Sequence, residues 1–264
     1  SKNLFNKVIL NASITEIVGK TRKDLYIDFR LDKNSSDPIE YAKFSGESVW
    51  KDFEEYYKNN VDRFQDTIGL NIYAQFNDLA YLAKFPNVKK LWIQGSRIPL
   101  GFPDMHNLLN LEEIHINGQG KPSSYEKLNT ALNLRNLYIG DWSISTQVKV
   151  ASFNVILKCK SLTKLYLSHF KIVEGSVREL ASLTSLQELT LPQNISVEDL
   201  AYLSVKMPSV SSEELKAYQE CNSTQGNVKV NGKRMPYLDK ERDKQKIQKY
   251  EADFEKLKKL LAGI

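Results

Sequence analysis

Four ring side chains recur at regular intervals through the middle of this sequence: Trp92, His115, Tyr138 and Tyr166. We call them the ring row. Each lies between two apolar residues, so in an extended strand it projects from the opposite face to those neighbours. Aromatic side chains dominate many protein interfaces, and the row therefore predicts a surface that binds a protein or peptide. The alternative is that the rings only stabilise one another across a sheet.

A second set of residues lies two positions before the rings and faces the same way. This charged row consists of Lys90, Glu113, Asn136, Lys164 and Glu188. Its mixed charge beside an aromatic ridge is typical of a docking groove. We expect Trp92, Tyr138 and Tyr166 to anchor the partner, with the other residues of the two rows around them.

The elements that must position these rows are strands with the pattern LxxLxL, in which the first, fourth and sixth residues point inward. Five copies begin at Val88, Leu111, Leu134, Leu162 and Leu186. Their central apolar residues are separated by 23, 23, 28 and 24 residues, as expected of repeats of roughly 20–29 residues. A sixth copy is expected at residues 67–72. The segments between strands, 78–84, 125–132, 147–159, 177–183 and 198–203, carry apolar residues at helical spacing and predict short helices.

These phrases resemble those of the leucine-rich-repeat superfamily over about residues 67–195. The resemblance implies an α/β solenoid, a short horseshoe with parallel strands on its concave face and helices on its convex face. It also implies protein recognition as the usual activity. Only two cysteines are present, too few for the disulfide caps of many extracellular members, and this is more similar to a bacterial or intracellular protein.

The flanks differ from the repeats, because a stack of repeats needs ends that cover its apolar faces. We expect an N-terminal α+β capping region at 1–66, the solenoid at 67–210, and a C-terminal cap at 211–264. The N-terminal cap should contain a strand at 25–31 and an amphipathic helix at 48–64, with an inward stripe formed by Trp50, Phe53, Tyr56 and Tyr57.

The C-terminal cap is expected to contain a hairpin and a helix. The pair Asn231-Gly232 predicts a tight turn, and Asp239 is suited to cap the helix that follows. The inward stripe of that helix is formed by Ile247, Tyr250, Phe254, Leu257 and Leu261.

No residue pattern indicates catalysis, a cofactor or a metal. The sequence has no phosphate-binding glycine loop, no HExxH, no CxxC and no GxSxG, and His106, His115 and His169 lack paired ligand spacing. Cys159 is expected to be a buried structural thiol. We therefore predict a non-enzymatic binding module, with a toxin-neutralising or effector-type protein as a narrower form of it. The alternatives are a hydrolase or transferase with a site at the seam between the N-terminal cap and the first repeat, where His106 could take part, and a carbohydrate-binding scaffold.

Bulk composition adds weaker expectations. A net charge of +5, spread along the 264 residues, gives no concentrated basic face, so no nucleic-acid partner is expected. No apolar run approaches the length of a membrane span. We expect a monomer in the cytoplasm. Because the sequence begins at Ser1, the alternative is a secreted protein whose leader sequence was removed before that residue.

Overall fold

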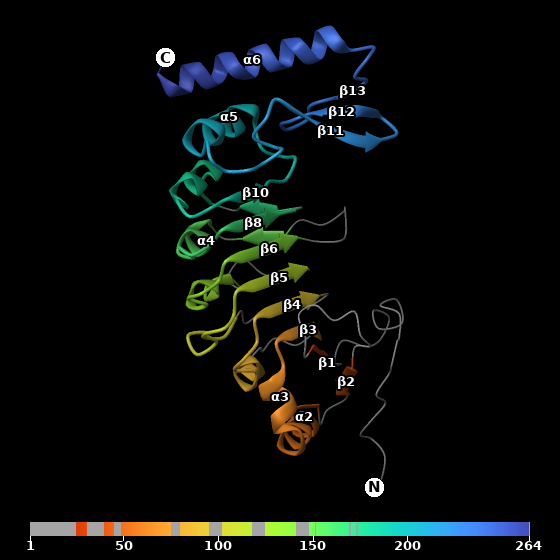
Figure 1. Cartoon of the computed structure of the whole chain (residues 1–264), viewed down its shortest axis with the longest axis vertical. Helices are drawn as coiled ribbons and strands as arrows, with labels where there is room; N and C mark the ends of the chain where they lie inside the picture. Colours follow the sequence, from red (N-terminus) through yellow and green to blue (C-terminus); the bar gives the residue numbers. More distant parts are fainter. Residues whose placement is uncertain are drawn as a thin grey trace.

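The fold is taken from a computed structural model. It describes residues 25–30, 40–44, 49–74, 80–94, 102–117, 125–140, 148–150, 152–168, 170–172 and 174–263. Its main feature is an eight-stranded sheet with the order β10-β8-β6-β5-β4-β3-β1-β2 (Figure 1). Six of these strands are parallel, one from each repeat: β3 (Gly69–Ala74), β4 (Lys90–Gln94), β5 (Glu113–Asn117), β6 (Asn136–Gly140), β8 (Lys164–Leu167) and β10 (Glu188–Thr190).

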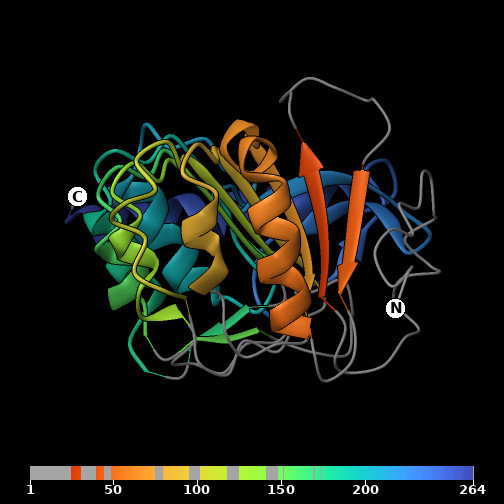
Figure 2. The ribbon, with the colours of Figure 1, turned by 90° about the horizontal axis from the view of Figure 1, so that it is seen from below.

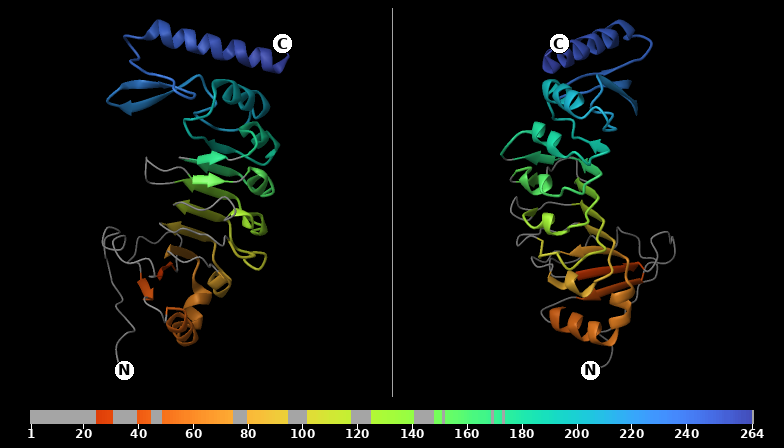
Figure 3. Two further views of the ribbon diagram at one scale, coloured as in Figure 1. Left: turned by 180° about the vertical axis from the view of Figure 1, so that it is seen from behind. Right: turned by 60° about the vertical axis from the view of Figure 1, so that its left-hand side comes forward.

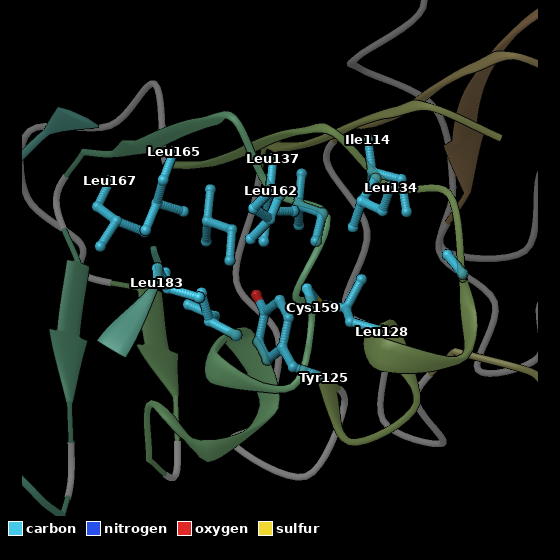
Figure 4. Packing of buried hydrophobic residues seen from close by; sticks show 14 of the residues in the cluster. Ile114, Tyr125, Leu128, Leu134, Leu137, Cys159, Leu162, Leu165, Leu167 and Leu183 are labelled. Atoms are coloured by element: carbon cyan, nitrogen blue, oxygen red, sulfur yellow. The ribbon is translucent and has the colours of Figure 1, made fainter. Parts of the chain in front are cut away.

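The repeats are stacked without any shift in register. The central apolar residues of successive strands pair directly, from Leu70 with Leu91 through to Leu165 with Leu189, so the sixth repeat predicted at 67–72 is present. All of these central residues are at most 1% exposed. Figure 4 shows how the leucines of neighbouring repeats fill the space between the sheet and the helical side.

Hydrogen bonds repeat with the same regularity where the chain enters each strand. The carbonyl of Lys89 accepts from the backbone N–H groups of Glu112 and Glu113, at 2.9 and 3.0 Å. In the next repeat, the carbonyl of Glu112 accepts in the same way from the N–H groups of Arg135 and Asn136. Side chains four residues before the central apolar positions add a second connection. The amide of Asn133 donates to the carbonyl of Leu109 at 2.8 Å, and the hydroxyl of Ser161 donates to the carbonyl of Leu132 at 3.3 Å.

The helical side of the solenoid carries short helices in the predicted segments, and several of them are 3-10 helices. It consists of short segments: the 3-10 helices η1 (Ala80–Lys84), η3 (Leu128–Thr130) and η4 (Val177–Ser182), and the α-helices α4 (Asn154–Leu157) and α5 (Val197–Lys206). Seen along the array, these segments lie on one side of the sheet (Figure 2). A 3-10 helix rises about 2.0 Å per residue, against 1.5 Å for an α-helix, so it spans the distance with fewer residues. Repeats of about 23 residues leave few residues for longer helices.

The longest repeat contributes one strand to an additional small sheet, and the next repeat contributes the other. Here β7 (Val148–Val150) pairs in parallel with β9 (Phe170–Ile172). The segment 147–159, expected to be helical, therefore begins as a strand and becomes helical only at Asn154. The 28-residue spacing of this repeat supplies the additional chain.

At the N-terminal end, β1 (Leu25–Arg30) pairs antiparallel with both β3 and β2 (Glu40–Phe44), which continues the sheet beyond the repeats. The helix predicted at 48–64 is present as two helices, α2 (Val49–Asn59) and α3 (Val61–Asp66), divided at Asn60. The amide of Asn60 donates to the carbonyl of Tyr56 at 2.8 Å, and such competition for backbone carbonyls disfavours helix continuation. Tyr56 and Tyr57 pack against the core, whereas the side chains of Trp50 and Phe53 lie outside the described residues.

At the other end, the array closes with a single parallel bridge between Glu188 and Ser211. A three-stranded sheet follows, formed by β11 (Tyr218–Ser223), β12 (Gly226–Val230) and β13 (Tyr237–Leu238). The helix α6 (Lys244–Ala262) then lies across the end of the molecule, over α5 and this sheet (Figure 3). Its predicted inward stripe is confirmed, with Ile247 and Phe254 buried and the other three members half-buried.

The turn assigned to Asn231-Gly232 was predicted at the wrong place. The two-residue turn joins β11 to β12 between Ser223 and Gly226, and Asn231-Gly232 lies in the longer connection to β13. The reason is tertiary: the buried amide of Asn231 donates to the carbonyls of Glu213 and Lys216, at 2.7 and 3.0 Å.

Asp239 was expected to cap the C-terminal helix, but its hydrogen bonds lie in the turn that precedes this helix. Its carboxylate accepts from the backbone N–H groups of Glu241 and Arg242, in the turn before α6, which begins at Lys244. These bonds lower the pKa of Asp239 below its usual value. Asp239 therefore fixes the approach to the helix and not its first turn.

The structure also bears on the predictions made for the cysteines and for membrane spans. Cys159 is buried among leucines, and burial raises the pKa of its thiol to about 12, as suits a structural thiol (Figure 4). Both Cys159 and Cys221 are free thiols. None of the described helices has the length and apolar character needed to cross a membrane.

Candidate functional site

The ring row is brought together on one face of the parallel sheet. Trp92 on β4 pairs with His115 on β5, which pairs with Tyr138 on β6, which in turn pairs with Tyr166 on β8. The described helices of the repeats lie on the opposite side of this sheet (Figure 2). Alternation along each strand keeps the leucines inside and the rings outside.

The rings stack on one another along the sheet. The centroids of His115 and Tyr138 are 4.0 Å apart with an angle of 4° between the ring planes. Trp92 and His115 are 5.5 Å apart at 26°, and Tyr138 and Tyr166 are 6.0 Å apart at 35°. Since the stacked faces cover each other, the row presents mainly ring edges outward. Tyr166 is 40% exposed, and the other three rings are half-buried.

The charged row lies beside the rings with the same pairing. Glu113 on β5 pairs with Lys90 and with Asn136, Asn136 pairs with Lys164, and Lys164 pairs with Glu188. All nine residues predicted from the sequence are thus on one continuous face. Whether a partner contacts them stays a prediction.

Glu113 is the most heavily bonded residue of this face. Its Oε1 accepts from Nε2 of His115 at 2.8 Å and lies 3.3 Å from Nζ of Lys90, and its Oε2 accepts from Nδ2 of Asn136 at 3.0 Å. Its side chain is only 12% exposed. The hydrogen bond from His115, followed by that from Asn136 and the charge of Lys90, outweighs desolvation and lowers the pKa of Glu113 to about 2.

The other charges of the face are also paired within it. Nζ of Lys164 lies 2.6 Å from a carboxylate oxygen of Glu188, and this hydrogen bond raises the pKa of Lys164 above its usual value. Burial, together with the charge of Glu113, raises the pKa of Tyr138. Every charge in the charged row therefore has a partner of opposite sign, and the surface offers little net charge to a ligand.

A third row was missed in the sequence. The outward position after the sixth residue of the pattern carries Asn117 on β5, Gly140 on β6 and Ser168 just after β8. A Cβ atom at position 140 would lie 3.2 Å from Cβ of Ser168, so the backbones come close there. Extending the repeat pattern by one position would have identified this row.

Of the other two histidines, only His106 is among the described residues. His106 lies in an exposed turn, where its Nδ1 is 2.5 Å from Oδ1 of Asp104, and His169 lies outside the described residues. Among the residues that the structure describes, no three His, Cys, Asp or Glu side chains gather closely enough to hold a metal ion.

No protein-family model and no curated protein matches this sequence. Among solved structures, it is similar to the LRR protein LIC12759 of Leptospira interrogans, with 20% identity, a TM-score of 0.45, and coverage of 60% of this chain and 39% of that one. It is similar to an internalin, InlF, from Listeria monocytogenes, with 18% identity, a TM-score of 0.39, and coverage of 69% and 52%. The chain thus spans about two fifths to half of the length of these proteins. Its own register, with one in-line parallel strand per repeat, identifies a leucine-rich-repeat solenoid.

Proposed function

We propose that this protein is a non-enzymatic interaction module that binds a partner protein or peptide on the sheet face formed by the ring and charged rows. The observation that carries the proposal is the continuous alignment of four rings on adjacent strands, with Tyr166 exposed at one end. Aromatic residues at the centre of a surface, with polar residues around them, are what interface hot spots require.

The stacking geometry favours a protein partner over a sugar. A sugar ring binds to an open aromatic face, whereas the faces of His115 and Tyr138 cover each other at 4.0 Å. The exposed ring edges and tyrosine hydroxyls are better suited to hydrogen bonds and edge contacts with backbone or side-chain groups.

The pairing of charges within the face indicates what kind of partner fits. Lys90 with Glu113, and Lys164 with Glu188, neutralise each other across neighbouring strands. A strongly charged ligand gains little from such a surface, so we infer a partner segment of low net charge. Affinity should then depend only weakly on salt.

The narrower role of a toxin-neutralising or effector-type protein uses the same face, and the identity of the bound partner decides it. The hydrolase or transferase alternative remains without a described site. Most side chains at the seam between the N-terminal cap and the first repeat lie outside the described residues. His106 lies away from this seam, in the exposed turn before β5, where its ring contacts Asp104.

Affinity capture from native lysate tests the proposal with three forms of the protein. The first is wild type, the second carries Trp92→Ala, Tyr138→Ala and Tyr166→Ala, and the third carries Leu109→Ala, Leu132→Ala and Leu260→Ala. The third is a matched control, because its leucines are exposed apolar residues elsewhere on the surface. A protein retained by wild type and the control but not by the ring variant supports the proposal. Equal retention by all three forms, or binding of glycans and not protein, contradicts it.

A further inference from the structure

A second candidate surface lies at the C-terminal end, far along the chain from the ring row. A groove with a volume of about 660 Å³ runs between β11 and α6. One wall is formed by Tyr218, Gln219 and Glu220 of β11, and the other by Glu251, Glu255 and Lys258 of α6.

The lining shows that the groove follows the edge of the small sheet. Successive side chains of a strand point to opposite faces, so three consecutive residues can line one groove only if it runs along the strand's edge. β11 is the outermost strand in the order β11-β12-β13. In the part of the chain that the structure describes, no strand pairs with its outer side.

β11 carries few of the features that usually protect a sheet edge. Its sequence, YQECNS, contains no lysine, arginine or proline. The irregularity in its pairing with β12 lies between Glu220 and Ser223, which leaves the stretch Tyr218–Glu220 regular beside the groove. Such an edge is a template for an additional strand.

The charge of the groove indicates what that strand should carry. Four glutamates and two lysines line it, and each lysine is already paired three residues away: Lys216 with Glu213 and Lys258 with Glu255. Glu251 forms no ion pair with any described residue. Exposed pairs of this kind contribute little and exchange easily. Glu220 is likewise paired, with Lys240, so Glu251 is the glutamate of this lining that meets a basic ligand without the exchange of an existing pair.

We propose that β11 binds an extended, lysine- or arginine-bearing segment of a partner protein, which adds to the sheet as a fourth strand between β11 and α6. The backbone of the segment pairs with the Tyr218–Glu220 stretch. Its basic side chains, on alternate residues, face Glu251 and Glu255 on α6. This surface is separate from the ring row and does not depend on the function proposed for it.

The probe is a fluorescent five-residue peptide, acetyl-Lys-Val-Lys-Val-Lys-amide, titrated with the full chain by anisotropy; the same peptide with Glu in place of Lys is the charge control. We expect saturable binding of the lysine peptide and none of the glutamate peptide. The double variant Glu251→Lys, Glu255→Lys should weaken binding at least roughly tenfold. Glu241→Lys, an exposed change in the turn before α6 and outside the groove lining, should leave it within about twofold.

Methylation of the peptide backbone separates strand pairing from simple charge attraction. Two lysine peptides are compared, one N-methylated on residues 2 and 4 and the other on residues 3 and 5. Because alternate N–H groups of a strand face one edge, only one of the two should lose binding. Equal binding of both methylated peptides, no binding of the parent peptide, or self-association through β11 without peptide binding would each overturn the inference.

Discussion

At the scale of single residues, Glu113 belongs to the charged row and also holds a neighbouring ring in place. It accepts hydrogen bonds from His115 on its own strand and Asn136 on the next, and it faces Lys90 on the preceding strand. With its carboxylate occupied in this way, it holds His115 in the plane that stacks on Tyr138. We infer that Glu113 positions the ring row, and its contact with a partner stays a prediction.

The lowered pKa of Glu113 predicts a pH dependence of stability. The pKa falls from 4.5 to about 2 on folding, so between these values the unfolded chain binds more protons and the free energy of unfolding rises with pH. The stabilisation is complete above about pH 4.5 and is lost as the pH falls towards 2. Urea titrations at pH 6, 4 and 3 should show a smaller loss on acidification for Glu113→Gln than for wild type. Parallel curves for the two proteins would show that this carboxylate does not stabilise the fold.

A comparison of one core leucine with one surface leucine tests which residues form the hydrophobic core. Leu137 is 0% exposed, and Leu137→Ala should lower the free energy of unfolding by about 2–5 kcal/mol. Leu132, five residues earlier, is 54% exposed, and Leu132→Ala should change it by less than about 0.5 kcal/mol. Denaturant midpoints measure both. An unchanged midpoint for Leu137→Ala would place this residue outside the core.

At the scale of elements, the strands and the places of the short helices were predictable, whereas the type of each helix and the strand β7 were not. An LxxLxL strand is specified locally, because alternation alone separates inward leucines from outward rings. Whether a segment forms an α-helix or a 3-10 helix depends on how many residues each repeat leaves between its strands. Apolar spacing does not distinguish the two kinds of helix over five residues. Asn231-Gly232 was misassigned for another reason: the side chain of Asn231 is used to hold distant carbonyls, which a local turn rule does not include.

That use of Asn231 predicts a weakened C-terminal cap when its amide is removed. Asn231→Ala leaves the carbonyls of Glu213 and Lys216 without a donor from this side chain, at a cost of about 1–3 kcal/mol. Hydrogen exchange should accelerate in β11, β12 and α6 and much less in β4 to β6. Asn222→Ala, an exposed asparagine in β11, is the matched control and should leave exchange unchanged. Uniform acceleration through the whole chain would contradict a local role.

At the scale of the whole molecule, the candidate face is a product of repetition. One residue per repeat at a fixed position becomes a continuous row once the strands stack in register, which is why all nine residues could be placed on one face from the sequence. The ring planes, the bonds converging on Glu113 and the close approach of Gly140 to Ser168 could not be predicted, since they depend on rotamers and on contacts between strands. The groove beside β11 likewise forms only when α6 lies across the end of the array.

The division between core and surface predicts how Tyr138→Ala behaves. Tyr138 stacks on the outer face between His115 and Tyr166, so its loss should cost only about 1 kcal/mol of stability. Partner affinity should fall at least about tenfold, as for a hot-spot residue. Thermal unfolding and a binding titration with the captured partner measure the two effects. Unfolding of the variant at room temperature would make the row structural and would remove it as a candidate site.

The most direct test of the central claim is site-specific photocrosslinking to the captured partner. A photoreactive benzoylphenylalanine replaces Tyr166, at the exposed end of the ring row, or Leu132, an exposed residue at the turn before β6. If the sheet face is the binding surface, irradiation will link the partner to position 166 and not to position 132. Crosslinks from position 132 alone, or equal crosslinks from both positions, would contradict recognition by the ring row.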